Sequence, residues 1–170
     1  SEASGASACD ACPEGTFEVN GQLCSECPAG FISFSENNSC IKCQAGFVAP
    51  KPGSSTCTPC ASGLFAEEGS AKCSACVSGT ISGAGSGKCS QCKAGRFAED
   101  AVTCEPCPGG TFAPAGSSTC QSCPVGHVSG PDSATCSSCQ GLLIRATPDV
   151  AKQNCQVDGM DVVLAFIAWI

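Results

Sequence analysis

The chain has few of the residues that build a large hydrophobic core. Its 170 residues include eight Phe, one Trp and no Tyr, spread along the sequence. Helical spacing of apolar residues is absent from residues 9 to 139, because glycine and proline interrupt every window. We therefore expect almost no helix there, and no single core of the kind that a conventional domain of this length buries.

Basic residues are also scarce. The chain has eight Lys and Arg against 15 Asp and Glu, which gives a net charge of −7 and a pI near 4.5. Neutralising phosphates requires clustered Lys and Arg, so this composition argues against a nucleic-acid partner. The acidic residues are scattered, as is typical of a solvated surface.

Methionine occurs once, at Met160, so Ser1 is not an initiator end. The first residues also lack the charged and then apolar pattern of a signal peptide. We expect either that a signal sequence has been removed or that the chain begins within a longer one.

Cysteine, by contrast, is abundant and periodic. Eighteen of the 19 cysteines form nine Cys-x-x-Cys pairs at intervals of 15 to 17 residues, which indicates tandem repeats. The pairs are Cys9/Cys12, Cys24/Cys27, Cys40/Cys43, Cys57/Cys60, Cys73/Cys76, Cys89/Cys92, Cys104/Cys107, Cys120/Cys123 and Cys136/Cys139, and Cys155 stands alone. This density of cysteine is typical of a secreted disulfide scaffold and predicts an extracellular or cell-surface location.

The repeats share three further positions when they are aligned on the second cysteine of each pair. The third residue after it is glycine in eight repeats, which predicts a tight turn with positive φ: Gly15, Gly30, Gly46, Gly63, Gly79, Gly95, Gly110 and Gly126. The fifth is apolar in all nine, and we expect it to be the recurring buried side chain: Phe17, Ile32, Val48, Phe65, Ile81, Phe97, Phe112, Val128 and Ile144. Four residues before the next cysteine, seven repeats have a second turn former: Asn20, Gly53, Gly69, Gly85, Asp100, Gly116 and Asp132. Each repeat is therefore expected to form a turn, a short strand, a second turn and a second short strand.

Disulfides must supply the stability that such small hairpins lack, since a two-stranded hairpin is marginal in water. The sequence alone leaves two connectivities open. In the sequential scheme, which we favour because it gives Cys155 a partner, the bridges are Cys12–Cys24, Cys27–Cys40, Cys43–Cys57, Cys60–Cys73, Cys76–Cys89, Cys92–Cys104, Cys107–Cys120, Cys123–Cys136 and Cys139–Cys155. Cys9 is then unpaired or bonded to another chain. An interlocked scheme begins with Cys9–Cys24 and Cys12–Cys27, and leaves a cysteine unpaired near the C-terminal end.

The ninth repeat departs from the pattern. Leu142 replaces the turn glycine, and the loop to Cys155 is longer than the others. Terminal repeats of an array are often atypical because they cap it. We therefore divide the chain into an N-terminal segment (1–8), nine tandem repeats (9–155) and an apolar C-terminal segment (156–170).

Three stretches carry a family resemblance: CPGGTFAPAGSSTCQSC (107–123), CPAGFISFSENNSCIKC (27–43) and CQAGFVAPKPGSSTCTPC (43–60). They resemble the ephrin-receptor-like cysteine-rich repeats, which occur in tandem in extracellular proteins, including surface proteins of protists and algae, and are distantly similar to tumour-necrosis-factor-receptor repeats. The resemblance covers residues 9 to about 139. It implies an elongated, disulfide-laddered rod outside the cell, and it implies no activity, because such repeats serve as stalks, spacers, coats and binding surfaces.

Other chemistry fits the cysteines less well. Paired Cys-x-x-Cys motifs bind zinc in other proteins, but nine of them do not divide into four-ligand sites, and the only histidine is His127. Redox catalysis needs one poised pair in a βαβ context, whereas these pairs are interchangeable. His127 occupies a variable position that four other repeats fill with Thr or Arg, so we interpret it as a surface residue. We predict no catalytic residue, no cofactor, no metal site and no enzyme.

Glycans are expected at the loop tips. Asn37-Asn38-Ser39 is an N-glycosylation sequon just before Cys40, so Asn37 is the predicted attachment site.

The last residues form the second informative feature, because a run of nine apolar residues follows Asp161. The run is far shorter than the roughly 20 residues that span a bilayer, so a membrane span requires that the chain continue past Ile170. Three interpretations stay open: a strand of a following domain or a cap on the ninth repeat, a strand inserted into a neighbouring chain, and the start of a membrane or lipid anchor. The candidate assembly contacts are Val162, Val163, Leu164, Phe166, Ile167, Trp169 and Ile170.

The predicted fold class is small disulfide-rich β repeats in an elongated, quasi-linear array of hairpin modules. With about four residues per repeat advancing along the axis, the array would be on the order of 100 Å long. We expect a non-enzymatic extracellular protein that coats, spaces or assembles into a filament; the alternative is the stalk of a receptor or adhesin whose binding domain lies elsewhere. The expected partners are further copies of the chain, joined head to tail, or adjoining domains.

Overall fold

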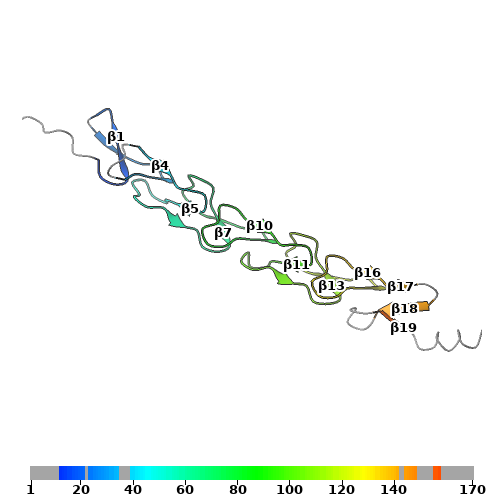
Figure 1. Ribbon diagram of the computed structural model, residues 1–170. Coiled ribbons are helices and arrows are strands. Elements are labelled where there is room, and N and C mark those ends of the chain that lie inside the picture. The colour runs from blue at the N-terminus through cyan, green and yellow to red at the C-terminus, as the bar shows by residue number, and fades with distance from the viewer. Residues whose placement is uncertain (1–11, 22, 35–38, 142–143, 149–154, 158–170) are drawn as a thin grey trace, which may run out of the picture. The chain divides into compact units, whose positions relative to one another are not determined.

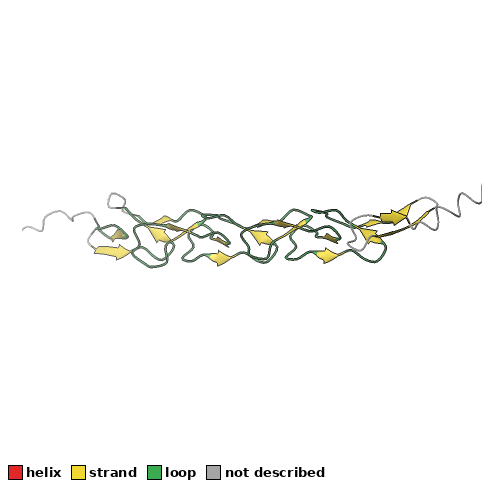
Figure 2. Ribbon diagram, turned by 90° about the horizontal axis from the view of Figure 1, so that it is seen from below, coloured by secondary structure: helices red, strands yellow, loops and turns green. Residues whose placement is uncertain are grey.

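The computed structural model describes residues 12–21, 23–34, 39–141, 144–148 and 155–157. This part of the chain consists of short strands, turns and loops and contains no helix (Figure 2). The predicted fold class of small β repeats is confirmed. The chain divides into two compact units: the described parts of Ser1–Cys76 with Ser82–Cys89, and those of Val77–Ile81 with Ser90–Ile170.

Nine disulfides divide the described chain into nine modules, numbered here in chain order. Each module begins at an opening cysteine and is closed by a cysteine 12 to 16 residues later. The bridges are Cys12–Cys24, Cys27–Cys40, Cys43–Cys57, Cys60–Cys73, Cys76–Cys89, Cys92–Cys104, Cys107–Cys120, Cys123–Cys136 and Cys139–Cys155. These are the pairs of the sequential scheme.

Each of the first eight modules forms one antiparallel hairpin together with the two residues that follow its closing cysteine (Figure 1). Its first strand directly follows the turn glycine, and its second strand includes the two residues between the cysteines of the next Cys-x-x-Cys pair. The hairpins are β1 (Thr16–Val19) with β2 (Leu23–Glu26), β3 (Phe31–Ile32) with β4 (Ile41–Lys42), β5 (Phe47–Val48) with β6 (Thr58–Pro59), β7 (Leu64–Phe65) with β8 (Ser74–Ala75), β9 (Thr80–Ile81) with β10 (Ser90–Gln91), β11 (Arg96–Phe97) with β12 (Glu105–Pro106), β13 (Thr111–Phe112) with β14 (Gln121–Ser122), and β15 (His127–Val128) with β16 (Ser137–Ser138).

The ninth module has a different sheet. Its three strands are β17 (Gln140–Gly141), β18 (Ile144–Pro148) and β19 (Cys155–Val157). The middle strand, β18, pairs with both of the others in antiparallel fashion. The sequence departs from the repeat register in this same module.

The first turn of each module depends on its glycine. All eight predicted glycines have φ between 80° and 90°, a region that only glycine enters without strain. The residue after the glycine donates its N–H to the carbonyl three residues earlier, as Thr16 does to Pro13 at 3.1 Å. This is the pattern of a β-turn with positive φ at its third residue.

The second turn also uses left-handed backbone, but the residue that adopts it differs between modules. Glycine occupies the position in four modules, and Asn20 and Asp132 occupy it with φ of 55° and 59°. In module 6 the positive φ falls on Ala101, at 58°. There the carboxylate of Asp100 accepts the N–H groups of Val102 and Thr103, at 2.9 and 3.0 Å, and holds the turn through its side chain.

The prediction that the fifth residue after the opening cysteine is always buried is wrong for most modules. Only Ile32 and Val48 are buried; Phe17, Phe65, Ile81, Phe97, Phe112 and Val128 are half-buried. Ile32 and Val48 are covered because each packs with the opening cysteine and the small residue of the next module. The buried positions are instead the opening cysteines, with Cys76 half-buried, and the small residue at the sixth position: Ser33, Ala49, Ala66, Ser82, Ala98, Ala113 and Ser129.

Two small clusters of buried residues are each shared by two adjacent modules. In one cluster Ile32 of module 2 packs with Cys43 and Ala49 of module 3. In the other, Val48 of module 3 packs with Cys60 and Ala66 of module 4. Modules 2 and 3 thus each bury an apolar residue only because the next module is folded against it.

Candidate functional site

Adjacent modules are joined by a repeated backbone hydrogen bond. The turn glycine donates its N–H to the carbonyl of the small buried residue in the next module. The bonds are Gly15 to Ser33, Gly30 to Ala49, Gly46 to Ala66, Gly63 to Ser82, Gly79 to Ala98, Gly95 to Ala113 and Gly110 to Ser129, with lengths from 2.7 to 3.1 Å. This contact is the same at seven successive junctions, so it is a property of the repeat.

A second backbone bond runs in the opposite direction. The residue at the second turn donates its N–H to the carbonyl of the opening cysteine of the preceding module. These bonds are Gly53 to Cys27, Gly69 to Cys43, Gly85 to Cys60, Gly116 to Cys92 and Asp132 to Cys107, at 2.8 or 2.9 Å. Each of these junctions is therefore fixed from both sides by main-chain groups, whatever the surface side chains are.

Three modules add a side-chain bond at the same junction. Ser33 Oγ donates to the carbonyl of Thr16 at 2.6 Å, and Ser82 and Ser129 donate in the same way to Leu64 and Thr111. These hydroxyls are buried, so the bond satisfies a group that burial would otherwise destabilise. Alanine at this position in the other modules leaves no polar group to satisfy.

A module also packs against the module two positions further along the chain. A β-carbon on Gly15, Gly30, Gly46 or Gly79 would overlap the carbonyl oxygen of Gly53, Gly69, Gly85 or Gly116, respectively. Gly95 stands in the same relation to Asp132. At these five positions the first-turn glycine is therefore required for space as well as for its φ, whereas a β-carbon on Gly126 would meet nothing. The repeat is thus interlocked, because one module contacts both of the next two.

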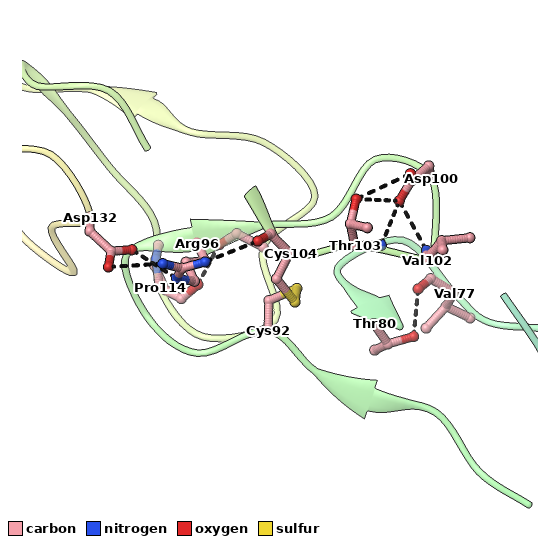
Figure 3. Close-up of a disulfide and its surroundings, with 11 residues drawn as sticks. Val77, Thr80, Cys92, Arg96, Asp100, Val102, Thr103, Cys104, Pro114 and Asp132 are labelled. Atoms are coloured by element: carbon pink, nitrogen blue, oxygen red, sulfur yellow. Dashed lines mark hydrogen bonds and ion pairs between the residues drawn. A yellow bond between two sulfur atoms is a disulfide. The ribbon is translucent and has the colours of Figure 1, made fainter. Parts of the chain in front are cut away.

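The contact between modules 6 and 8 is reinforced by charge (Figure 3). Arg96 Nε lies 3.1 Å from Asp132 Oδ1, and the same guanidinium donates to the Cys104 carbonyl at 3.2 Å. Both side chains of the ion pair are more than two-fifths exposed, so solvent screens much of the attraction. The pair makes a modest addition to packing that the backbone already specifies.

Hydrogen bonds to the carboxylate of Asp100 shift its pKa. The N–H groups of Thr103 and Val102 donate to its carboxylate and lower its pKa, because they favour the charged form (Figure 3). The carboxyl is fully exposed, and this pKa shift reports the geometry of one turn.

The cysteines of the described residues are all in disulfides, so none of these sulfurs is available as a thiolate ligand or nucleophile. Within these same ranges, no group of three or more His, Cys, Asp or Glu residues is arranged to hold a metal ion. His127 lies half-buried in β15, with its Nδ1 3.2 Å from the Val125 carbonyl.

Several residues singled out in the sequence lie outside the described residues. They are Cys9, the predicted glycosylation site Asn37, and the candidate assembly contacts Val162, Val163, Leu164, Phe166, Ile167, Trp169 and Ile170. Their roles stay predictions. The buried residue at the sixth position was not predicted from the sequence, although Ser or Ala stands there in seven of the nine repeats.

Repeated hairpins closed by disulfides suit a structural role, and disulfides in this number are typical of proteins that fold in an oxidising compartment. Across the ranges that the structure describes, no helix is long and apolar enough to cross a membrane. No protein-family model matches the chain, and no curated protein is significantly similar to it.

Proposed function

We propose that the protein is a non-enzymatic extracellular structural protein, whose disulfide-stapled modules coat, space or assemble into a filament. The observation that carries this proposal is the interlocked repeat, in which each junction reuses the same backbone bonds and the same glycine contact. A scaffold of this kind grows in length without acquiring a larger core.

The disulfides also support an extracellular role. Each closes a loop of 12 to 16 residues and contributes about 3 kcal/mol to the free energy of unfolding in the chain-entropy model. This compensates for the little stability that the small buried apolar area of a module provides. A chain that depends on such bridges is stable only where thiols are oxidised. This agrees with the resemblance to ephrin-receptor-like repeats, which we retain as part of the proposal.

Assembly follows from the two features that flank the repeats. In the sequence, Cys9 precedes the first closed module, and the apolar run 162–170 follows the last. Contacts between unlike ends repeat without closing, which makes a fibre. The protein would then act as a protomer, with further copies of itself as its main partner.

The test is self-association of the full chain, purified without reductant. Sedimentation velocity over a wide concentration range should show species that grow with concentration, and negative-stain electron microscopy should show regular filaments. A monodisperse monomer at every concentration would contradict the filament proposal and favour the stalk of a receptor or adhesin.

A further inference from the structure

An apolar hollow of about 280 Å³ lies on modules 2 and 3. Ile32, Phe34, Ile41 and Phe47 form much of its lining, and Lys42 is the one charged residue among those that line it. Phe34 and Ile41 are 48% and 41% exposed, so two large apolar side chains face solvent at one place.

The module fold does not require these two apolar residues. Phe34 is the seventh residue after its opening cysteine, where the other seven hairpin modules have Val19, Pro50, Glu67, Gly83, Glu99, Pro114 and Gly130. Ile41 follows its closing cysteine, where they have Ser25, Thr58, Ser74, Ser90, Glu105, Gln121 and Ser137. Most of these residues are small or polar, and those modules form the same hairpin.

Module 6 has a hollow that shares three of these repeat positions and has the opposite chemistry. It measures about 220 Å³ and is lined by Phe97, Glu99, Asp100, Thr103 and Glu105. Glu99 and Glu105 occupy the positions of Phe34 and Ile41, so positions that are apolar around one hollow are acidic around the other. The apolar version is therefore specific to the hollow of modules 2 and 3, and it calls for an apolar occupant.

We propose that this hollow binds the apolar segment 162–170 of a second copy of the chain. The segment is nine consecutive apolar residues and needs burial, and the hollow presents apolar surface that needs covering. Asp161 directly precedes the segment and complements Lys42 in charge. A volume of about 280 Å³ is at the small end of binding pockets, which fits one or two large side chains such as Phe166 and Trp169.

This inference rests on the proposed function and identifies the surfaces that would join its protomers. The hollow belongs to modules 2 and 3, and the segment follows module 9, so the contact joins unlike surfaces. Such a contact leaves one hollow and one segment unfilled in every assembly that does not form a ring, and further copies add at both ends.

The single tryptophan provides the test. Trp169 lies in the segment and the chain has no Tyr, so intrinsic fluorescence reports on the segment alone. As the full chain is concentrated, the emission maximum should move to shorter wavelength together with the growth of oligomers in sedimentation velocity. Phe34→Ser with Ile41→Ser should remove the wavelength shift and weaken self-association by at least about tenfold, since the loss of one buried large apolar side chain is already worth that factor. Lys42→Glu should weaken it as well.

Val125→Ser is the matched control, because Val125 is 91% exposed and does not line the hollow. It should leave both readings unchanged, and disulfide mapping of each variant checks that the modules are closed as in the parent chain. Self-association that persists in the Phe34/Ile41 variant would overturn this inference and leave the proposed function standing. An emission maximum that is already at short wavelength at the lowest concentration would show that the segment is buried within its own chain. That result would also overturn this inference. Absence of self-association would overturn both this inference and the filament proposal.

Discussion

The carbonyl oxygen of Gly85 occupies the space where a β-carbon of Gly46 would stand, although 39 residues separate the two glycines in the sequence. Gly46 belongs to the first turn of module 3 and Gly85 to the second turn of module 5. The contact places two turns in backbone contact across the intervening module. It makes the first-turn glycine a requirement of packing between modules as well as of the turn itself.

Gly46→Ala should therefore destabilise the chain more than Gly85→Ala. Both glycines have positive φ, 90° and 70°, so alanine is strained at either position by about 1 to 3 kcal/mol. Only the change at Gly46 adds an overlap with backbone, since the nearest atoms to a β-carbon on Gly85 are those of Phe47 at 3.8 Å. Thermal unfolding by calorimetry should show a clearly lower transition for Gly46→Ala. Equal transitions for the two variants would mean that modules 3 and 5 are not packed as described.

The small residue at the sixth position gives a second matched pair. Ala98 is 1% exposed and stands where modules 2, 5 and 8 have serine. Ala98→Val should cost about 1 to 3 kcal/mol by overpacking the junction. Ala98→Ser should be tolerated, because the serines at this position donate to a carbonyl of the preceding module. Denaturant unfolding measures both, and a valine as stable as the serine would show that the junction is loosely packed.

Removal of one disulfide should loosen one part of the array. Replacing Cys60 and Cys73 with alanine removes the bridge of module 4 and should cost about 3 kcal/mol in the chain-entropy model. Glu67 and Glu68 are exposed within the opened loop, so cleavage there by a glutamyl endopeptidase should accelerate by about 100-fold if local opening limits cleavage. Cleavage after Glu99 in module 6 is the internal control and should change little. Equal acceleration at both places would indicate that the modules unfold as one unit.

The turn at Asp100 should respond to acid in a defined direction. Its folded pKa is lowered below the ordinary value of 3.8 by the N–H groups of Thr103 and Val102, so the charged form is favoured by folding. The ionised Asp100 carboxylate therefore stabilises the folded turn at pH values above the ordinary pKa. This stabilisation is lost as the pH falls through the lower folded pKa. In an NMR titration, the amide signals of Val102 and Thr103 should shift with a midpoint below 3.8. A midpoint at or above that value would contradict the hydrogen bonds, and Asp100→Ala should remove the titration.

The features that the sequence predicts correctly are those that depend on local chemistry. The positive φ of Gly15 and its counterparts follows from a turn only four residues long, which any repeat must make in the same way. The absence of helix from the described residues follows equally from glycine and proline in every window. Hairpins of two-residue strands are consistent with the few residues that remain between turns and cysteines.

The features that the sequence analysis missed depend on contacts between modules. The fifth-position residues, such as Phe65, attract attention because they are large, yet the buried position is the small neighbour, such as Ala66. The residue there must be small because the backbone of the adjacent module packs against it. The sequence pattern within one repeat does not show that contact. The contact of Gly46 with Gly85 and the ion pair of Arg96 with Asp132 each join modules that are two apart. The sequence of a single repeat did not predict either contact.

The claim that each module is closed by its own disulfide is tested most directly by peptide mapping of the unreduced chain. Trypsin with a glutamyl endopeptidase cuts after Glu14, Glu26, Glu36 and Lys42, which separates Cys24 from Cys27 and Cys40 from Cys43. The account predicts that peptide 27–36 is bonded to peptide 37–42, through Cys27 and Cys40. Peptide 27–36 bonded instead to the peptide that contains Cys12, or free thiols or bound zinc at these cysteines, would contradict it.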